Sequence, residues 1–309
     1  MIIWMIKRII LLPVTLSVLI TISFFMMRLA PGGPFSSERN LDPVIEKALM
    51  EKYHLDEPLL QQYLRFLKDL SKGNLGPSFN QKSKTVQEII TNTLPTSISL
   101  GLFAILIALS FGLCMGIIAA LYRSGPIDYF TMLLAVLGMS VPAFVIGPIL
   151  QLLFTRHWSI LPTAGYHGLS EPSYLILPAL TLGLPFAARI ARLSRGGMLE
   201  VLHQNYIKTA RARGLSEWRV IMNHALKGAL VPVASYLGPA IAAVTTGSLV
   251  VEKIFQIPGL GREFIESALN RDYTLAMGTV LVYGSLLIIL NLISDLISAW
   301  MDPRLRSQV

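Results

Sequence analysis

Three short motifs contain residue types that could do chemistry, and each lacks a part that the chemistry needs. The run Gly76-Pro-Ser-Phe-Asn-Gln-Lys-Ser83 is typical of a phosphate-binding loop, except that Gln81 stands where the second glycine is required. Gly138-Met-Ser-Val-Pro142 lacks the final glycine of a nucleophile elbow and has no histidine nearby in sequence. Gly259-x-Gly261 lacks the third glycine of a dinucleotide-binding turn. These motifs therefore predict neither a nucleotide site nor an intramembrane enzyme.

Metal-ligand patterns are also missing from the sequence. The five histidines, at positions 54, 157, 167, 203 and 224, show no metal-ligand spacing. The one cysteine, Cys114, allows no disulfide within the chain and no thiolate metal site. We expect no metal and no cofactor on this chain.

A basic segment, residues 189–228, separates two strongly apolar runs. It holds eight Lys/Arg and two acidic residues. Such a segment between apolar runs marks the cytoplasmic face of a membrane protein, because short cytoplasmic loops retain Lys and Arg. As a set, these cations favour a protein partner on that face, whereas nothing about them indicates nucleic-acid binding.

The rest of the composition predicts a protein that crosses a membrane several times. The chain is 53% hydrophobic and only 14% charged, which is too apolar for an ordinary soluble domain. A span needs about 20 mostly apolar residues. Six runs qualify: 9–29, 98–121, 129–154, 174–188, 229–251 and 279–300. We interpret the first as an uncleaved span. We expect the short fourth run to continue as helix into the basic segment.

The charge distribution predicts that both termini are cytoplasmic. With this orientation the cytoplasmic pieces hold thirteen Lys/Arg against four Asp/Glu, while the external pieces hold twelve against thirteen. The net charge of +8 is then an asymmetry between the two sides of the membrane. Asp295 is the single acid that we place within a span, where it is a candidate functional group by default.

Local sequence signals predict helices in both long polar segments. In the external segment we expect a helix from Asp42 to about Tyr53, a second from Pro58 to Leu70, and a short amphipathic stretch over 86–90. In the basic segment we expect a helix over 199–213, a turn at Gly214, and a second helix capped by Ser216. That second helix should place Trp218, Met222, Ala225 and Ala229 on one face.

The basic segment resembles the cytoplasmic loop of ABC importer permeases. It contains Tyr206-Ile-Lys-Thr-Ala-Arg-Ala-Arg-Gly-Leu215, followed by His224-Ala-Leu-Lys-Gly-Ala-Leu-Val-Pro232. The general family loop has an acid, two alanines, three further residues and a glycine, and later Ile-x-Leu-Pro. Here Lys208, His224 and Lys227 replace the acid, the isoleucine and the proline. These departures resemble the peptide-transporting branch, whose loop runs Tyr-x-x-Thr-Ala-Arg-Ala-basic-Gly-Leu and later His-Ala-Leu.

Other motifs extend this resemblance over essentially the whole chain. Arg28-Leu-Ala-Pro-Gly-Gly-Pro34, Pro258-Gly-Leu-Gly261, Asn270-Arg-Asp-Tyr273 and Asp302-Pro-Arg304 look like signatures of the peptide branch. The stretch from Ile22 to Phe35, together with Gly76-Pro-Ser-Phe79, resembles the B-type subunit of oligopeptide permeases more than the dipeptide or nickel relatives.

The resemblance implies an all-α polytopic fold of six transmembrane helices, like a type I ABC importer permease. The parts would be a first span (1–29), a small helical external insertion (30–97) and a five-span core (98–309). Such a subunit is non-catalytic and lies in the bacterial inner membrane, surrounded by lipid. Its family partners are a second, homologous permease, an extracytoplasmic peptide-binding protein, and two cytoplasmic ATPases that hold the ATP and Mg²⁺.

The resemblance also places the contact with the ATPases in the basic segment. The residues that it assigns to this coupling are Tyr206, Thr209, Ala210, Arg211, Ala212, Arg213, Gly214, Leu215 and His224. For the translocation path we name the polar span residues Gln151, Asn291 and Asp295. Dipeptides, nickel chelates or another small solute remain open as cargo. An ion-coupled secondary transporter is a rival, which would need ionisable groups near the middle of the membrane.

Overall fold

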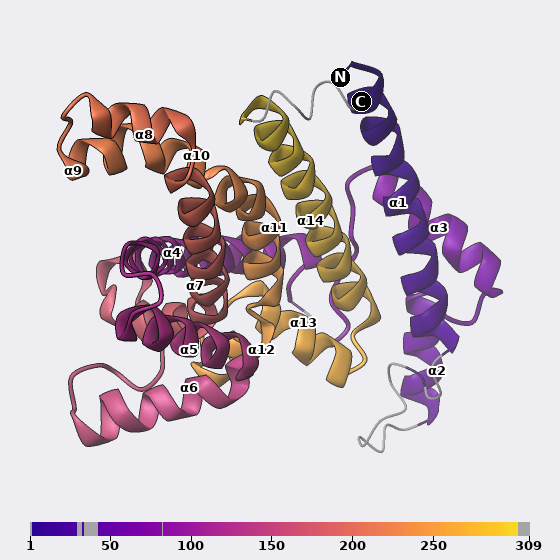
Figure 1. Cartoon of the computed structure of the whole chain (residues 1–309). Helices are drawn as coiled ribbons and strands as arrows, with labels where there is room; N and C mark the ends of the chain where they lie inside the picture. The colour runs from indigo at the N-terminus through magenta and orange to yellow at the C-terminus, as the bar shows by residue number, and fades with distance from the viewer. Residues whose placement is uncertain (1, 30–32, 34–42, 82, 302–309) are drawn as a thin grey trace. The chain divides into compact units, whose positions relative to one another are not determined.

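The computed structural model describes residues 2–29, 33, 43–81 and 83–301. Every regular element in these ranges is helical, and the single β-bridge, between Pro77 and Thr85, stands alone. Figure 1 shows this all-helical architecture, which confirms the predicted fold class. The Asp302-Pro-Arg304 motif and most of the 30–42 segment lie outside the described residues.

The chain forms two compact units, which we describe separately. The first comprises Met1–Trp4, Ser97–Ile257 and Leu287–Val309, and the second comprises Met5–Thr96 and Pro258–Leu286. The long helices α1 (Ile2–Leu29), α4 (Val86–Leu121) and α14 (Tyr273–Met301) each contribute to both units.

The first unit is built around α7 (Ser173–Leu202), a 30-residue helix. The other elements of this unit, in chain order, are α5 (Pro126–Ser140), α6 (Ala143–Gln151), a π-helix (Leu152–His157), a short 3₁₀ turn (Gly168–Ser170), α8 (Asn205–Ala212), α9 (Glu217–Arg219), a second π-helix (Val220–Ala225), α10 (Leu226–Ala229), α11 (Val231–Gly247) and α12 (Leu249–Ile254). α7 packs against α5, α6, α10 and α11. The fourth predicted span therefore does continue as helix into the basic segment, as expected.

Glycines let α4 approach α7 closely. A Cβ atom at Gly116 would lie 1.9 Å from Ser194 Oγ and 2.3 Å from the Ala191 carbonyl oxygen. A Cβ at Gly112 would lie 2.6 Å from the Ala187 carbonyl oxygen. These small residues thus serve helix packing within the subunit, which is the usual role of a small-xxx-small face.

Six apolar segments could cross a membrane, but two of them are bent. Four single helices are long and apolar enough, and two helix pairs qualify if each pair counts as one span. The third expected span, 129–154, is not one straight helix, because α5 and α6 meet at 108°. Val141 is extended there (φ −86°, ψ 123°), as the residue before a proline tends to be. The segment Glu217–Ala229, which runs from α9 through α10, meets Val231–Thr245 of α11 at 51°, just before Pro232.

The first unit buries an acid just outside a predicted span, and the expectation for Asp295 stays untested. We predicted that Asp295 was the single acid within a span, and its side chain lies outside the described residues. Glu252 on α12, just past the end of the fifth predicted span, is fully buried and accepts hydrogen bonds from Ser97 (2.7 Å) and Ser248 (2.6 Å). Two hydroxyl donors partly offset the cost of burying this carboxylate.

The second unit contains the short helices α2 (Pro43–Lys52), α3 (Leu59–Ser71) and α13 (Leu260–Leu269). The first two confirm the helices expected in the external segment. The short stretch expected at 86–90 is instead the first turn of α4. Thr85 and Glu88 form a reciprocal capping box, with Glu88 N to Thr85 Oγ1 at 3.2 Å and Thr85 N to Glu88 Oε2 at 3.0 Å. This box starts the helix at Val86, and apolar residues then carry it onward.

Asp272 joins two segments of the second unit that are far apart in sequence. It is 1% exposed and lies at the N-terminus of α14, where its Oδ1 accepts a hydrogen bond from Leu275 N (3.1 Å) and lies 3.0 Å from Thr274 Oγ1. Its Oδ2 accepts from the Ser78 hydroxyl and from Asn80 N. The Gly76–Phe79 and Asn270–Tyr273 motifs therefore meet at one buried carboxylate. Charge-assisted bonds of this kind are among the stronger hydrogen bonds in proteins.

Candidate functional site

The basic segment folds into a helical hairpin at one end of α7. We call residues 205–229 the hairpin; it comprises α8, α9, the second π-helix and α10 (Figure 1). Gln204 precedes α8 in an extended conformation (φ −68°, ψ 149°). The single helix expected over 199–213 is therefore wrong, since α7 ends at Leu202. In a straight helix Val201 and Ile207 would point about 120° apart at 3.6 residues per turn, and the break lets both join one buried cluster.

An apolar cluster fixes the hairpin to the membrane helices. Ile207, Val220, Ala225 and Ala229 are fully buried there, together with Met198 of α7. A Cβ at Gly197 would lie 2.4 Å from the Ala229 carbonyl oxygen, so α7 and α10 are in backbone contact. Because close-packed interiors transmit strain, a force applied to the hairpin would reach α7 directly.

Two large aromatic side chains of the hairpin are exposed. Tyr206 is 49% exposed and Trp218 is 68% exposed. We expected Trp218 on the same face as Ala225 and Ala229, which are buried, and this expectation is wrong. The π-helix over 220–225 explains the difference, because its i→i+5 bonding holds more residues per turn and rotates the register. Exposed tryptophan and tyrosine side chains are typical anchors of protein interfaces.

Gly214 forms the turn between the two limbs of the hairpin. Its φ is +75°, which confirms the predicted left-handed conformation. A Cβ at this position would meet nothing within 4 Å, so the requirement for glycine here is conformational. Ser216 occupies the N-cap position of α9 as expected, but its hydroxyl makes no capping hydrogen bond.

An ion pair closes the hairpin across this turn. Arg211 Nε and Nη2 donate to the two carboxylate oxygens of Glu217, at 2.8 and 3.1 Å. Both side chains are exposed, so the pair stabilises the turn by about 1 kcal/mol at most. Arg211 therefore has a partner inside the hairpin.

The other predicted coupling residues divide into exposed and structural positions. Ala212 and Arg213 are exposed, as is His224 on the returning limb. The basic residues Lys208 and Arg219, outside the predicted coupling set, are exposed too. Ala210 is buried, Leu215 packs against the apolar cluster, and Thr209 Oγ1 donates to the Asn205 carbonyl oxygen at 3.0 Å. The predicted coupling set thus contains exposed residues and residues that pack or hydrogen-bond inside the hairpin.

Among the described residues, no hydrogen bond joins the residues that we predicted for the translocation path. Gln151 Nε2 donates to the Thr163 carbonyl oxygen at 2.8 Å, which ties the end of α6 to the following loop. Asn291 is half-buried on α14, and the side chain of Asp295 lies outside the described residues. Their role in the path stays a prediction.

Sequence reasoning missed a buried ion pair near the hairpin. Asp128, in the first turn of α5, is 3% exposed, and Arg195 of α7 binds it through two bonds of 2.6 and 2.7 Å. Asp128 Oδ2 also accepts from Ser124 N at 3.0 Å. A carboxylate in the first turn of a helix, after Gly-Pro, was the available signal. Its partner lies 67 residues away and could not be identified from sequence.

Comparison with known proteins gives a consistent set of relatives. Residues 112–307 match the family model described as "binding-protein-dependent transport system inner membrane component". The oligopeptide transport system permease protein of Haemophilus influenzae is 46% identical over 292 residues, which covers 94% of this chain and 95% of that protein. Its counterpart in Escherichia coli K12 is 45% identical, with the same coverage. The dipeptide transport system permease protein of Bacillus subtilis is 42% identical over 98% of this chain and 97% of its own.

Solved structures show the same fold at low sequence identity. A chain of the MetNI methionine ABC transporter in an inward-facing conformation superposes with a TM-score of 0.55 at 15% identity, covering 70% of this chain and 97% of that one. A chain of an amino acid ABC transporter gives 0.53 at 16% identity, covering 69% and 94%. With the family match over residues 112–307, more than half of the chain, these findings identify the chain as a member of the family of binding-protein-dependent transport system inner membrane components.

Proposed function

We propose that this chain is a membrane subunit of an ATP-driven peptide importer, where it forms half of the translocation path. The observation that carries this proposal is the hairpin, which packs rigidly on α7 and presents exposed aromatic and basic side chains. Relatives named oligopeptide permeases, which align over almost the whole chain, support peptides as the cargo.

In this proposal the hairpin receives force from an ATPase subunit. Shifting the ratio of inward-facing to outward-facing molecules from 1:99 to 99:1 requires a partner whose binding free energy differs by about 5.5 kcal/mol between the two states. Tyr206 and Trp218 provide apolar contact area for such an interface, and Arg213 provides charge complementarity to an acidic partner. The buried cluster under the hairpin then passes the movement to α7.

The family membership supports an assembly with other subunits. We infer a second permease, two cytoplasmic ATPases that bind ATP and Mg²⁺, and an extracytoplasmic binding protein that delivers peptide. This chain binds no nucleotide and performs no catalysis in that scheme. The hairpin, as the ATPase contact, lies in the cytoplasm, and both termini lie there too.

Dipeptides are a second candidate cargo. The dipeptide permease of Bacillus subtilis covers slightly more of this chain than the oligopeptide relatives do, at 42% identity. Both cargoes require the same coupling through the hairpin, so the choice between them leaves the mechanism unchanged.

Thiol labelling from outside tests the proposed orientation. Ser71, Ser170 and Ser216 are all exposed, and Ser170 and Ser216 lie beyond opposite ends of α7. In intact cells, cysteine at Ser71 or Ser170 should react with an impermeant reagent, and cysteine at Ser216 should react only after the membrane is opened. The experiment needs a Cys114→Ala background, because Cys114 is itself exposed on α4. Labelling of Ser216→Cys from outside would overturn both the orientation and the coupling role of the hairpin.

A further inference from the structure

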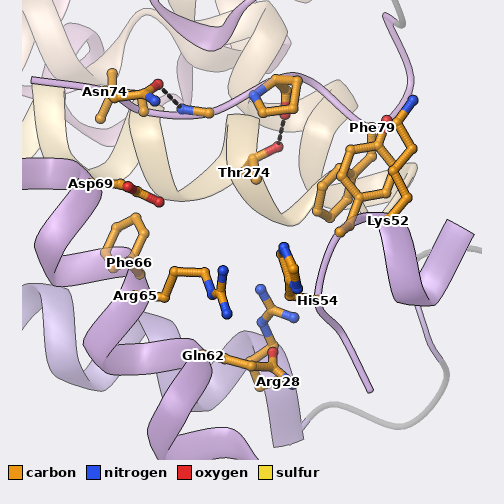
Figure 2. Close-up of a pocket in the computed structure, with 14 residues that line it drawn as sticks. Arg28, Lys52, His54, Gln62, Arg65, Phe66, Asp69, Asn74, Phe79 and Thr274 are labelled. Atoms are coloured by element: carbon orange, nitrogen blue, oxygen red, sulfur yellow. Dashed lines mark hydrogen bonds between the residues drawn. The ribbon is translucent and has the colours of Figure 1, made fainter. Parts of the chain in front are cut away.

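The second unit contains a preformed cavity of about 300 Å³ that the coupling mechanism does not use. Its walls come from α1, α2, α3, the 72–79 loop and the start of α14, and Figure 2 shows the lining side chains. Aromatic residues Tyr53, Phe66 and Phe79 line it together with three cationic side chains. This volume is at the lower end of the range for small-molecule sites.

Arg28 supplies a guanidinium with no acidic partner among the described residues. Its Cζ lies 5.3 Å from the centroid of the Phe24 ring and 5.2 Å from that of Tyr273, so two aromatic rings hold it in place. Arg65, across the cavity, differs because it is paired with Glu57. A half-buried cation held only by aromatic rings is poised to bind an anion.

The remaining charged groups leave the cavity positive. Lys52 Nζ lies 5.5 Å from the Tyr53 ring centroid. His54 lies 3.1 Å from Glu57 Oε1, and Asp69 is the one acid among the lining residues. The two positive charges of Arg28 and Lys52 exceed the single negative charge of Asp69, so the cavity favours a ligand with one negative charge.

Gln62 adds a hydrogen-bond acceptor without a partner. The side chain is 8% exposed, and its Nε2 donates to the carbonyl oxygens of Leu55 (3.0 Å) and Glu57 (2.7 Å). These two bonds fix the orientation of the amide, so that Oε1 has no partner in the described structure. Gln62 and Arg28 are both among the side chains that line the cavity (Figure 2). An unsatisfied buried acceptor is costly, and Oε1 has almost no accessible surface, so an N–H donor of a ligand would reach it after a small shift of the surrounding side chains.

The opposite wall is rigid. Thr274 Oγ1 donates to the Pro77 carbonyl oxygen at 2.6 Å, and Gly76 N donates to Asn74 Oδ1 at 2.9 Å. Asp272 also joins these two segments, because its carboxylate contacts the side chains of Ser78 and Thr274. A site that needs no ordering on binding loses less affinity to entropy.

We propose that this cavity binds the carboxylate end of a peptide chain. The carboxylate would pair with Arg28, the preceding amide N–H would donate to Gln62 Oε1, and the terminal side chain would contact the rings of Phe66 and Phe79. A phosphodiester would offer no such N–H group. The inference rests on the proposed function, which places this cavity on the external side of the membrane, where either a transported peptide or the binding protein could supply the carboxylate.

Binding of small peptide probes tests the site without requiring transport. The full chain with its partner permease in nanodiscs exposes both faces, so the result does not depend on orientation. N-acetyl-Leu-Phe should bind at least tenfold more tightly than its C-terminal amide, by isothermal titration. Arg28→Gln should remove that preference, Lys52→Gln should weaken acid binding two- to threefold, and Lys68→Gln, an exposed change outside the cavity, should have no effect.

The outcomes separate the proposal from its alternatives. Equal binding of acid and amide, or an acid preference that survives both Arg28→Gln and Lys52→Gln, would overturn it. Binding of inorganic phosphate as tight as that of N-acetyl-Leu-Phe would also refute a peptide carboxylate site. If the free acid displaces the binding protein from wild-type nanodiscs, then the binding protein supplies the carboxylate; if it does not, the transported peptide does.

Discussion

Gly214→Val should reduce ATP-driven peptide uptake about tenfold while leaving membrane insertion intact. The left-handed conformation at φ +75° costs an L-residue about 1–2 kcal/mol, and a β-branched side chain is disfavoured further. The turn would open or shift, so Tyr206 and Trp218 would no longer be presented together. A loss of about 1.4 kcal/mol in the seated hairpin corresponds to a factor of ten. The measurement is uptake per molecule of protein in the membrane.

Two matched variants separate coupling from general strain. Gly168 has φ +74° and equally open surroundings, but it lies in the 3₁₀ turn before α7, away from the hairpin, so Gly168→Val should leave uptake near normal. Gly214→Asn should retain most uptake, because asparagine tolerates the left-handed conformation better than other residues. Equal losses in Gly214→Val and Gly168→Val would assign the effect to folding, and normal uptake in Gly214→Val would leave the glycine as a mere helix stop.

Arg195→Met should destabilise the protein by about 3 kcal/mol, because it leaves the buried carboxylate of Asp128 without its main partner. For a protein of this size the melting temperature in nanodiscs should fall by roughly 6 °C. Arg192→Met removes the same charge from an exposed position on the same helix and should change stability by less than about 0.5 kcal/mol.

The double variant provides the decisive comparison for this pair. Asp128→Asn combined with Arg195→Met leaves no buried charge, and asparagine can still accept from Ser124 N. It should therefore be more stable than Arg195→Met alone by about 2 kcal/mol. If the effects of the two substitutions on the free energy of unfolding simply add, the ion pair does not couple α5 to α7 energetically. It then has no part in passing force from the hairpin.

The spans and the turn were predictable because they depend on local sequence. Apolar runs of about 20 residues located the membrane helices, and the residue type at Gly214 was enough to predict its left-handed conformation. The capping box at Thr85 and Glu88 was also readable, yet residues 86–90 were predicted as a separate stretch and not as the first turn of α4.

What sequence could not provide were departures from regular helix and contacts between distant residues. A period of 3.6 residues placed Trp218 on the buried face of the expected helix. In the structure the π-helix that follows changes the register, and Trp218 is exposed. Ser78 and Asp272 are separated by 194 positions, so nothing local links them. The bend at Val141 follows from a proline that was visible, but its angle is set by packing against α7.

Peptide uptake by reconstituted proteoliposomes tests the central claim most directly. Liposomes that contain this chain with its partner permease, its two ATPases and peptide-loaded binding protein should accumulate peptide only when ATP is supplied on the hairpin side. The same lipid with this chain alone should neither hydrolyse ATP nor take up peptide. Vigorous uptake by the chain alone, driven by a proton gradient and indifferent to ATP, would contradict the account and establish a secondary transporter instead.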